Sequence, residues 1–169
     1  KHDGCIAVKC LYPITFQRNI NADKNMGIYT NKVTMEQLVK YRDDIKLAPV
    51  MAQEYIPKHL ELRVTVVGLK IFACAIYSQD SEKTKDDWRR YDFENVKHKS
   101  YKLPAEIEGK LLRLMKEWKL NFGAIDMVLT PDNKYVFLEI NPSGQYAWIE
   151  GMTGMPISKT IAETLTNPP

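Results

Sequence analysis

The alternation of apolar and polar positions is clearest toward the C-terminal end of the chain, where it predicts a β-hairpin. Residues 124–130 and 135–140 are rich in apolar, β-branched and aromatic side chains. The Pro-Asp-Asn-Lys segment between them, residues 131–134, has the composition of a turn. An earlier hairpin is predicted over residues 61–77, where two similar runs meet at a glycine.

The remaining elements follow from shorter patterns and from residues that typically begin or end them. Thr34 and Asn31 are alternative candidates for the N-cap of one helix, and Pro104 is a favourable first residue for another. We predict helices over residues 34–44, 104–119 and 157–165, strands over residues 5–9, 27–30 and 50–56, and loops over residues 12–25, 78–99 and 146–156. The apolar stripe of the second helix, which includes Trp118, is expected to face the core.

Three oxygen-bearing side chains interrupt the C-terminal hairpin: Asp126, Glu139 and Asn141. Glu139 and Asn141 are two residues apart and point the same way, and Asp126 lies near them if the strands pair around the predicted turn. Two carboxylates and an amide oxygen on one face repel each other unless a cation lies between them, and Mg²⁺ prefers such ligands. The alternative is a solvent-exposed face, which is the better interpretation for Asp126 alone but not for all three.

Three further groups of residues have both a structural and a functional interpretation. Lys9, at the end of a strand, is either a solvated lysine or a fixed positive charge suited to a phosphate. Glu61 and Arg63, on one strand face, form either an ion pair or part of a nucleotide site. Residues 88–91 (Trp-Arg-Arg-Tyr) either bind a partner or lie in a loop that Trp88 pins to the protein.

Composition narrows the class of protein without identifying a ligand. The 169 residues suffice for one domain or two small lobes, and the formal net charge of +3 is too small to indicate a nucleic-acid partner. No apolar run approaches the ~20 residues that span a membrane, so no membrane partner is expected. The three cysteines lie in apolar strand contexts, which indicates buried thiols in a reducing compartment and hence a cytoplasmic location. Because the chain begins almost at once with a strand, we expect an N-terminal part to precede it.

Four features together resemble the ATP-grasp ligases: a strand ending at Lys9, residues 53–56 followed by Glu61, Asp126 with Glu139 thirteen residues later, and Asn141 two residues beyond. Longer segments are similar to the microviridin-type (graspetide) peptide ligases of that superfamily: Gln-Glu-Tyr-Ile-Pro-Lys-His-Leu-Glu-Leu-Arg, Asp-Trp-Arg and Phe-Leu-Glu-Ile-Asn-Pro-Ser-Gly-Gln. The resemblance implies an α+β fold with mainly antiparallel sheets in two lobes and flanking helices. It implies a partial small lobe at residues 1–56 and a catalytic lobe at residues 57–169, with the N-terminal domain of the family missing.

The resemblance also implies a function. These ligases use ATP and Mg²⁺, expected as two ions, to activate side-chain carboxylates of a ribosomal precursor peptide as acylphosphates, and a hydroxyl or amine then forms a lactone or lactam. By position, the resemblance assigns the metal to Asp126, Glu139 and Asn141, and the phosphates to Lys9 and Arg63. It assigns the adenine to Glu54, Tyr55 and Ile56, with Gln53 as a further cofactor-binding residue, and the ribose to Glu61. Catalysis is assigned to Arg63 and Arg89, with Arg89 facing either the acceptor carboxylate or the transferred phosphate.

Two departures from the family pattern leave alternatives open. No glycine-rich loop follows Lys9, and Ala124 stands where some ATP-grasp enzymes have an arginine, so the tetrahedral intermediate is stabilised by either Arg63 or Arg89. One alternative is a ligase of the same fold that adds an amino acid such as glutamate to a peptide or protein. Another is a non-catalytic module that binds a nucleotide or a peptide. The oligomeric state is open, with a homodimer as one alternative.

Overall fold

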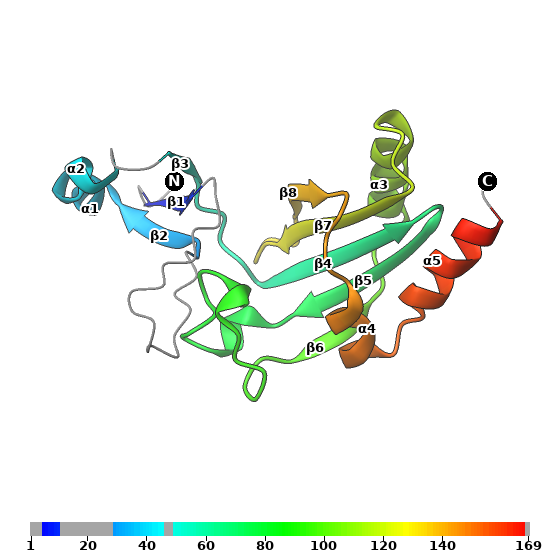
Figure 1. Cartoon of the computed structure of the whole chain (residues 1–169). Coiled ribbons are helices and arrows are strands. Elements are labelled where there is room, and N and C mark those ends of the chain that lie inside the picture. The colour runs from blue at the N-terminus through cyan, green and yellow to red at the C-terminus, as the bar shows by residue number, and fades with distance from the viewer. Residues whose placement is uncertain (1–4, 11–28, 46–48, 168–169) are drawn as a thin grey trace, which may run out of the picture. The chain divides into compact units, whose positions relative to one another are not determined.

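The computed structural model describes the chain in two compact units (Figure 1). The described residues are 5–10, 29–45 and 49–167. Unit 1 contains the described residues up to Ile56 together with Glu82–Tyr91, and unit 2 contains Pro57–Ser81 and the described residues from Asp92 onward. The loop predicted over residues 12–25 lies outside the described residues, as does half of the strand predicted over residues 27–30.

Unit 1 is built on a three-stranded antiparallel sheet with the strand order β2-β1-β3. Its elements are β1 (Cys5–Cys10), β2 (Asn31–Thr34), α1 (Met35–Lys40), α2 (Arg42–Ile45), β3 (Val50–Glu54) and the 3₁₀ turn η2 (Trp88–Arg90). Thr34 caps α1 as predicted, because its hydroxyl accepts a hydrogen bond from the backbone N–H of Gln37. The Gln37 side chain accepts a hydrogen bond from the backbone N–H of Thr34 in return. This capping box satisfies donors that the first turn of a helix otherwise leaves unpaired.

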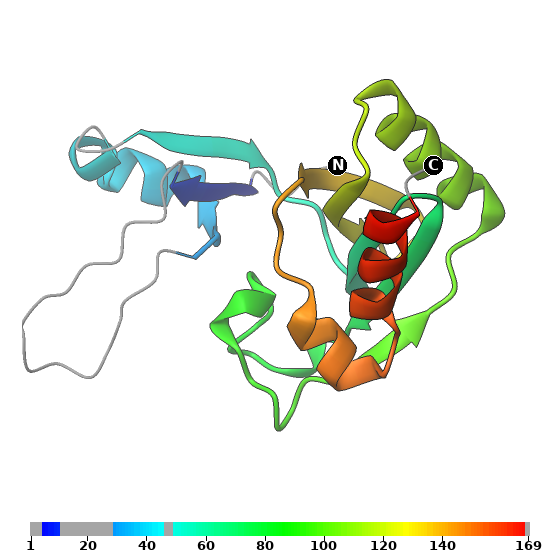
Figure 2. The ribbon, with the colours of Figure 1, turned by 45° about the vertical axis from the view of Figure 1, so that its right-hand side comes forward.

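Unit 2 is built on a five-stranded antiparallel sheet with the strand order β6-β5-β4-β7-β8 (Figure 1). Its strands are β4 (Leu60–Val67), β5 (Lys70–Ile76), β6 (His98–Tyr101), β7 (Phe122–Leu129) and β8 (Tyr135–Asn141). Its helices are α3 (Ala105–Glu117), α4 (Ala147–Thr153) and α5 (Ile157–Thr166), with the 3₁₀ turn η1 at Ser78–Asp80. Helix α3 lies on one face of the sheet, and α4 and α5 lie on the other (Figure 2). Both predicted hairpins are present, and the α+β fold class with mainly antiparallel sheets is confirmed.

The sheet face beneath α3 forms the core of unit 2. Leu62, Val64 and Val66 alternate along β4, and all three are almost completely buried. They belong to one apolar cluster with Leu111 and Met115 of α3. Burying a side chain of this size stabilises the fold by about 1.5–3 kcal/mol. The polar residues between them on β4 must therefore point to the opposite face, since successive side chains alternate.

The structure differs from the sequence-based predictions at five places. Residues 29–30 are not in a strand, and β2 lies instead at Asn31–Thr34. The helix predicted over residues 34–44 is divided into α1 and α2 by a turn at Tyr41. Helix α4 lies where residues 146–156 are predicted to form a loop, and β6 begins within the loop predicted over residues 78–99. Neither element shows a periodic apolar pattern, because α4 is short and contains Gly151, and β6 is a mostly polar edge strand. Trp118 does not face the core: it is 56% exposed, because α3 ends at Glu117 and Trp118 occupies the C-cap.

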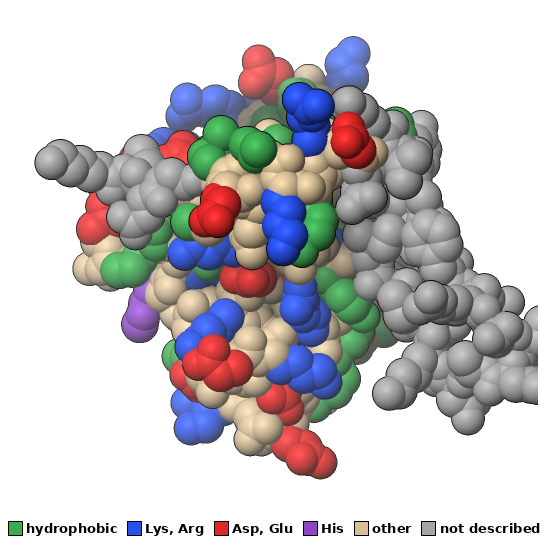
Figure 3. Space-filling view, turned by 90° about the vertical axis from the view of Figure 1, so that its left-hand side faces the viewer, with side chains coloured by type: hydrophobic (Ala, Val, Ile, Leu, Met, Phe, Trp, Pro, Cys, Tyr) green, Lys and Arg blue, Asp and Glu red, His purple; other side chains and the backbone are tan. Residues whose placement is uncertain are grey.

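Charged side chains of both signs lie on the face of the molecule drawn in Figure 3. Lys and Arg side chains are interspersed with Asp and Glu side chains over the face drawn in Figure 3. This distribution agrees with the small formal net charge of +3. None of the helices in the described part of the chain is long and apolar enough to cross a membrane.

Candidate functional site

Three charged side chains form a row across the middle of the unit 2 sheet. Arg63 of β4 pairs with Asp126 of β7, and Asp126 pairs with Glu139 of β8. Directly opposed residues of antiparallel strands point to the same face, so the three side chains are neighbours. Arg63 Nη1 donates a hydrogen bond to Asp126 Oδ1 at 2.6 Å, and the two side chains are only 10% and 15% exposed. Little water therefore screens the charges of the Arg63–Asp126 pair.

Asn141 lies beside this row on the same face. It pairs with Ala124, two residues before Asp126, so its side chain points the same way as those of Asp126 and Glu139. Its Oδ1 accepts a hydrogen bond from the backbone N–H of Ser143 at 2.9 Å, and an amide oxygen has a second lone pair for another partner. The predicted placement of three oxygen donors on one face is confirmed, whereas metal binding by them stays a prediction.

Two buried polar atoms on this face have no hydrogen-bond partner among the described residues. They are Arg63 Nε and Thr65 Oγ1. A buried polar group without a partner costs about 1–3 kcal/mol, so such groups are rare away from places that a ligand or an ordered water occupies. The free donor on Arg63 indicates that this face has capacity for a further acceptor.

The donor set fits a hard cation such as Mg²⁺. It contains two carboxylates and one amide oxygen, and Mg²⁺ is usually bound by one or two carboxylates together with phosphate oxygens and waters. No group of three His, Cys, Asp or Glu side chains that could hold a metal is found within the described ranges. The set is therefore incomplete as an all-protein cage and is suited to a metal that brings other ligands with it.

Glu61, the predicted ribose ligand, lies on the same strand face and is paired with a lysine. Lys58 Nζ donates a hydrogen bond to Glu61 Oε1 at 3.0 Å, and both side chains are largely buried. A buried charge needs its partner, because removal of one partner leaves the other uncompensated. Lys58 is not among the predicted site residues, since it lies in an irregular segment with no periodic pattern. The ribose contact of Glu61 stays a prediction.

In unit 1, the predicted nucleotide-binding residues lie on β1 and at the end of β3. The pairing of these strands places Lys9 and Gln53 on one face of the sheet and Glu54 on the opposite face. Tyr55 and Ile56 follow the end of β3 and are half-buried. Contacts of these residues with adenine and phosphates stay predictions.

Lys32 belongs to the same face of unit 1, although nothing in the sequence pattern singles it out. It pairs with Ala7 of β1, and this position places it on the face that carries Lys9. Its Nζ lies 4.6 Å from the centre of the Tyr55 ring, a distance at which the ring attracts a cation. Two lysines and Gln53 therefore share this face.

Arg89, a predicted catalytic residue, is oriented by a buried aspartate. Asp87 is 2% exposed, and its carboxylate accepts hydrogen bonds from Arg89 Nε at 2.9 Å and Arg89 Nη2 at 3.1 Å. Burial alone would raise the pKa of Asp87, but the hydrogen bonds and charge of Arg89 and the backbone N–H of Thr30 hold this pKa below its usual value. The Arg89 side chain is itself 44% exposed, so the buried Asp87 carboxylate orients a guanidinium that remains in contact with solvent.

The segment Glu82–Tyr91 is attached to the rest of unit 1 by several contacts. Trp88 is buried. Arg90 Nη2 donates hydrogen bonds to the carbonyl of Thr30 and to the side chain of Asn31. These contacts support the interpretation that Trp88 pins the segment, and binding of a partner by the same segment stays a prediction.

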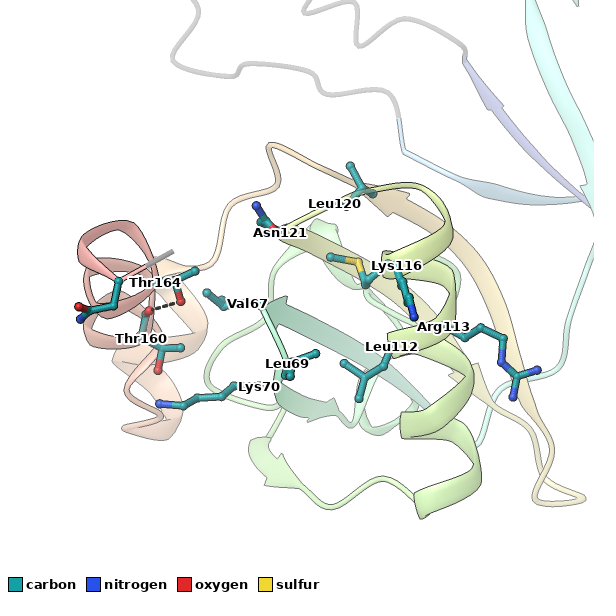
Figure 4. Close-up of a pocket in the computed structure, with 13 residues that line it drawn as sticks. Val67, Leu69, Lys70, Leu112, Arg113, Lys116, Leu120, Asn121, Thr160 and Thr164 are labelled. Carbon is teal, nitrogen blue, oxygen red and sulfur yellow. Dashed lines mark hydrogen bonds between the residues drawn. The ribbon is translucent and has the colours of Figure 1, made fainter. Parts of the chain in front are cut away.

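A groove of about 620 Å³ lies between α3 and α5, beside the turn that joins β4 to β5 (Figure 4). Val67 lines it from the end of β4 and Leu69 from the turn, Leu112 and Lys116 line it from α3, and Thr164 lines it from α5. No predicted site residue is among the described residues that line it. The groove and the charged row are therefore separate features of unit 2.

Comparison of the sequence with protein-family models and with curated proteins gave no match. Solved structures do match. A Chryseobacterium gregarium RiPP-associated ATP-grasp ligase, in complex with ADP and a leader and core peptide, has a TM-score of 0.83 and 32% sequence identity. The macrocyclase MdnC from Microcystis aeruginosa MRC, bound with precursor peptide MdnA, has a TM-score of 0.76 and 41% identity. Each match covers 98% of this chain and 49% of the other, so this chain spans about half the length of these structures.

More distant matches share the fold. The ATP-grasp ligase PsnB, complexed with a phosphomimetic variant of minimal precursor, Mg and ADP, has a TM-score of 0.69 and 18% identity over 96% of this chain and 46% of PsnB. The chain therefore has the ATP-grasp fold. More particularly, its structural neighbours are ATP-grasp ligases of ribosomal peptides, and this confirms the resemblance that the sequence motifs indicate.

Proposed function

We propose that this chain forms the ATP-binding and catalytic part of a ligase that modifies a ribosomal precursor peptide. The ligase would join side-chain carboxylates of the peptide to hydroxyl or amine groups, giving lactone or lactam cross-links. The proposal is supported by neighbours that are a macrocyclase bound with its precursor peptide and a ligase in complex with ADP and a leader and core peptide.

The observation that carries the proposal is the row of Arg63, Asp126 and Glu139 with Asn141 beside it. A single sheet face there presents one guanidinium and three oxygen donors in a partly buried setting. Oxygen donors suit a metal, and the planar fork of an arginine suits phosphate or carboxylate oxygens. Such a combination fits a metal–nucleotide complex better than it fits either an isolated cation or an isolated anion.

In this proposal Asp126, Glu139 and Asn141 would hold Mg²⁺, expected as two ions. When bound, Mg²⁺ would neutralise charge on the phosphates of ATP. Lys9 and Lys32 of unit 1 would face phosphates as point charges, Gln53 and the hinge that follows it would bind adenine, and Glu61 would bind the ribose. The unit 1 assignments rest on the sequence resemblance, together with the shared face of Lys9, Lys32 and Gln53.

The proposed reaction replaces a poor leaving group on the peptide carboxylate with phosphate, which leaves more readily. A carboxylate is a poor acyl donor, because the group that must leave is oxide. In the first step a carboxylate oxygen of the peptide bonds to the γ-phosphorus of ATP, and the bond to ADP breaks. In the second step a hydroxyl or amine bonds to the acyl carbon, loses its proton, and releases phosphate.

The chain supplies positive charge at both steps. Arg63, which Asp126 holds in place, is assigned to the phosphate oxygens, and Arg89, which Asp87 holds in place, is assigned to the peptide carboxylate or the transferred phosphate. The tetrahedral oxyanion of the second step would be stabilised by one of these two arginines. Removing one such donor typically costs ~3–4 kcal/mol of transition-state stabilisation.

The test is ATP-dependent turnover by the full-length protein, measured as phosphate release with candidate peptides. Asp126→Ala and Glu139→Ala are each expected to lower turnover by at least ~100-fold while the circular dichroism spectrum stays that of the wild type. Glu106→Ala is the matched control, since Glu106 is an exposed carboxylate on α3. Activity retained in both site variants would end the proposal.

The same assay separates the alternatives. A peptide that loses water in the presence of ATP, detected by mass, supports the cross-linking ligase, and a gain of one amino-acid residue supports the amino-acid-adding ligase. Binding of nucleotide without any phosphate release supports a non-catalytic module. The cytoplasmic location and a homodimeric state stay predictions.

A further inference from the structure

The chain that leaves β8 folds back over the sheet before α4 begins (Figure 1). It does so through a tight turn in which Asn141 takes part twice. The backbone N–H of Gly144 donates to the Asn141 carbonyl at 3.2 Å, and the backbone N–H of Ser143 donates to Asn141 Oδ1 at 2.9 Å. A side chain that bonds the backbone two residues on stabilises such a turn. The orientation of the Asn141 amide therefore depends on where the turn lies.

The turn approaches the sheet at the pair Ala124 and Gly144. A Cβ atom added to Gly144 would lie 2.4 Å from the Cβ of Ala124, far inside the ~3.5–4.0 Å at which carbon atoms normally meet. The same added atom would lie 3.3 Å from Arg63 Nη2. The turn can occupy this place only because residue 144 has no side chain and residue 124 has only a methyl group.

Arg63 links the turn to the charged row. Its Nη2 donates to the carbonyl of Gln145 at 3.4 Å, while its Nη1 donates to Asp126 Oδ1 at 2.6 Å. One guanidinium thus contacts the turn that orients Asn141 and also contacts a predicted metal ligand. A shift of the turn away from Ala124 would lengthen the weaker of these two hydrogen bonds and rotate the Asn141 amide.

We propose that Ala124 and Gly144 are positioning residues, whose contact sets the placement of Asn141 and Arg63 for a metal–nucleotide complex. This inference rests on the proposed function, and it names two residues that touch neither metal nor nucleotide in that proposal. It predicts that the size of the side chains at these two positions controls the Mg²⁺-dependent part of nucleotide affinity.

The test measures ADP affinity of the full-length protein by calorimetry, with Mg²⁺ and with EDTA. Gly144→Ala and Ala124→Val are each expected to weaken binding of Mg²⁺–ADP by roughly 10- to 100-fold, the usual effect of disturbing the residues that orient metal ligands. Binding of ADP in EDTA is expected to change by less than roughly threefold, because Asp126 still holds the Arg63 guanidinium and the metal ligands do not act there. Ala124→Ser, which adds one atom, serves as a milder variant should either of the others unfold.

Two kinds of control separate positioning from general damage. Gly109→Ala and Gly151→Ala add the same atom where it meets nothing within 4 Å, and they are expected to bind Mg²⁺–ADP as the wild type does. The double variant Ala124→Gly with Gly144→Ala removes the methyl group that the new Cβ would strike. It is expected to recover Mg²⁺–ADP affinity to within roughly threefold of the wild type.

The affinities of these variants distinguish failure of the inference from failure of the proposed function. A Gly144→Ala protein that binds Mg²⁺–ADP normally, or that loses affinity equally with and without Mg²⁺, overturns the inference and leaves the proposed function standing. Loss of affinity that the double variant does not recover overturns the Ala124–Gly144 contact as its cause. A wild-type protein that binds no Mg²⁺–ADP removes the proposed function, and this inference with it.

Discussion

At the scale of single residues, two aspartate–arginine ion pairs differ in how far the arginine is buried, and this difference suits them to different roles. In the pair of Arg63 with Asp126, both side chains are largely buried, so the guanidinium keeps one orientation beside the predicted metal ligands. In the pair of Asp87 with Arg89, only the carboxylate is buried and the guanidinium reaches solvent. The first arrangement suits an anion held in one fixed place, and the second suits a charged group that arrives from solution.

The Asp87 anchor gives a prediction for stability against pH. The pKa of Asp87 lies below its usual value of about 4, so the bonds that it accepts stabilise the fold above that pH and are lost as the pH falls through the lowered pKa. Asp87→Asn, which keeps the shape and removes the charge, should lower the free energy of unfolding by about 2 kcal/mol at pH 7. Denaturant unfolding from pH 7 to pH 2 should show the two proteins converging at the acid end.

Asp43→Asn provides the control for this experiment, because Asp43 is an exposed carboxylate on α2. It should change the free energy of unfolding by less than about 0.5 kcal/mol at any pH. A difference between Asp87→Asn and the wild type that stays constant down to pH 2 would mean that the charge of Asp87 does not stabilise the fold.

At the scale of elements, the helices and strands that could be predicted from the sequence are those whose apolar residues recur periodically. Helix α3 and the strands of both hairpins bury one face, and their apolar residues therefore recur with the period of the element. Helix α4 and strand β6 lack that signal, because each is short and gains its place from contacts with distant segments. Trp118 fits the α3 stripe by spacing but lies past the last helical residue, a boundary that periodicity does not define.

This difference predicts how two substitutions on one apolar stripe should behave. Leu111→Ala removes a buried side chain from the core and should lower the free energy of unfolding by about 2–5 kcal/mol. Trp118→Ala removes a larger side chain that is mostly exposed, and it should cost less than about 1 kcal/mol. Denaturant unfolding of the two variants checks the order, and an equal or larger loss for Trp118→Ala would show that Trp118 packs against the protein in solution.

At the scale of the whole molecule, the candidate residues are divided between two units that the chain joins at three places. Lys9, Gln53 and Arg89 belong to unit 1, whereas Arg63 and the oxygen donors belong to unit 2. Spacing along one hairpin was enough to predict that the oxygen donors share a face, since a strand has a period of two. The partners of Lys32 and Asp87 could not be predicted in the same way, because Lys32 meets the Tyr55 ring across paired strands of unit 1 and Asp87 meets the backbone of Thr30, which is distant in the sequence.

The division of the candidate residues leads to a prediction about Lys9. If unit 1 supplies phosphate contacts to the nucleotide, Lys9→Ala should weaken binding of a non-hydrolysable ATP analogue by roughly tenfold or more, the loss expected for one hydrogen bond to a charged group. Affinity for adenosine, which has no phosphates, should stay the same. Lys40→Ala, on the exposed surface of α1, should leave both affinities unchanged. Calorimetric titrations distinguish the outcomes: an unchanged affinity for the ATP analogue places the phosphates elsewhere, and an equal loss for adenosine gives Lys9 a structural role in unit 1.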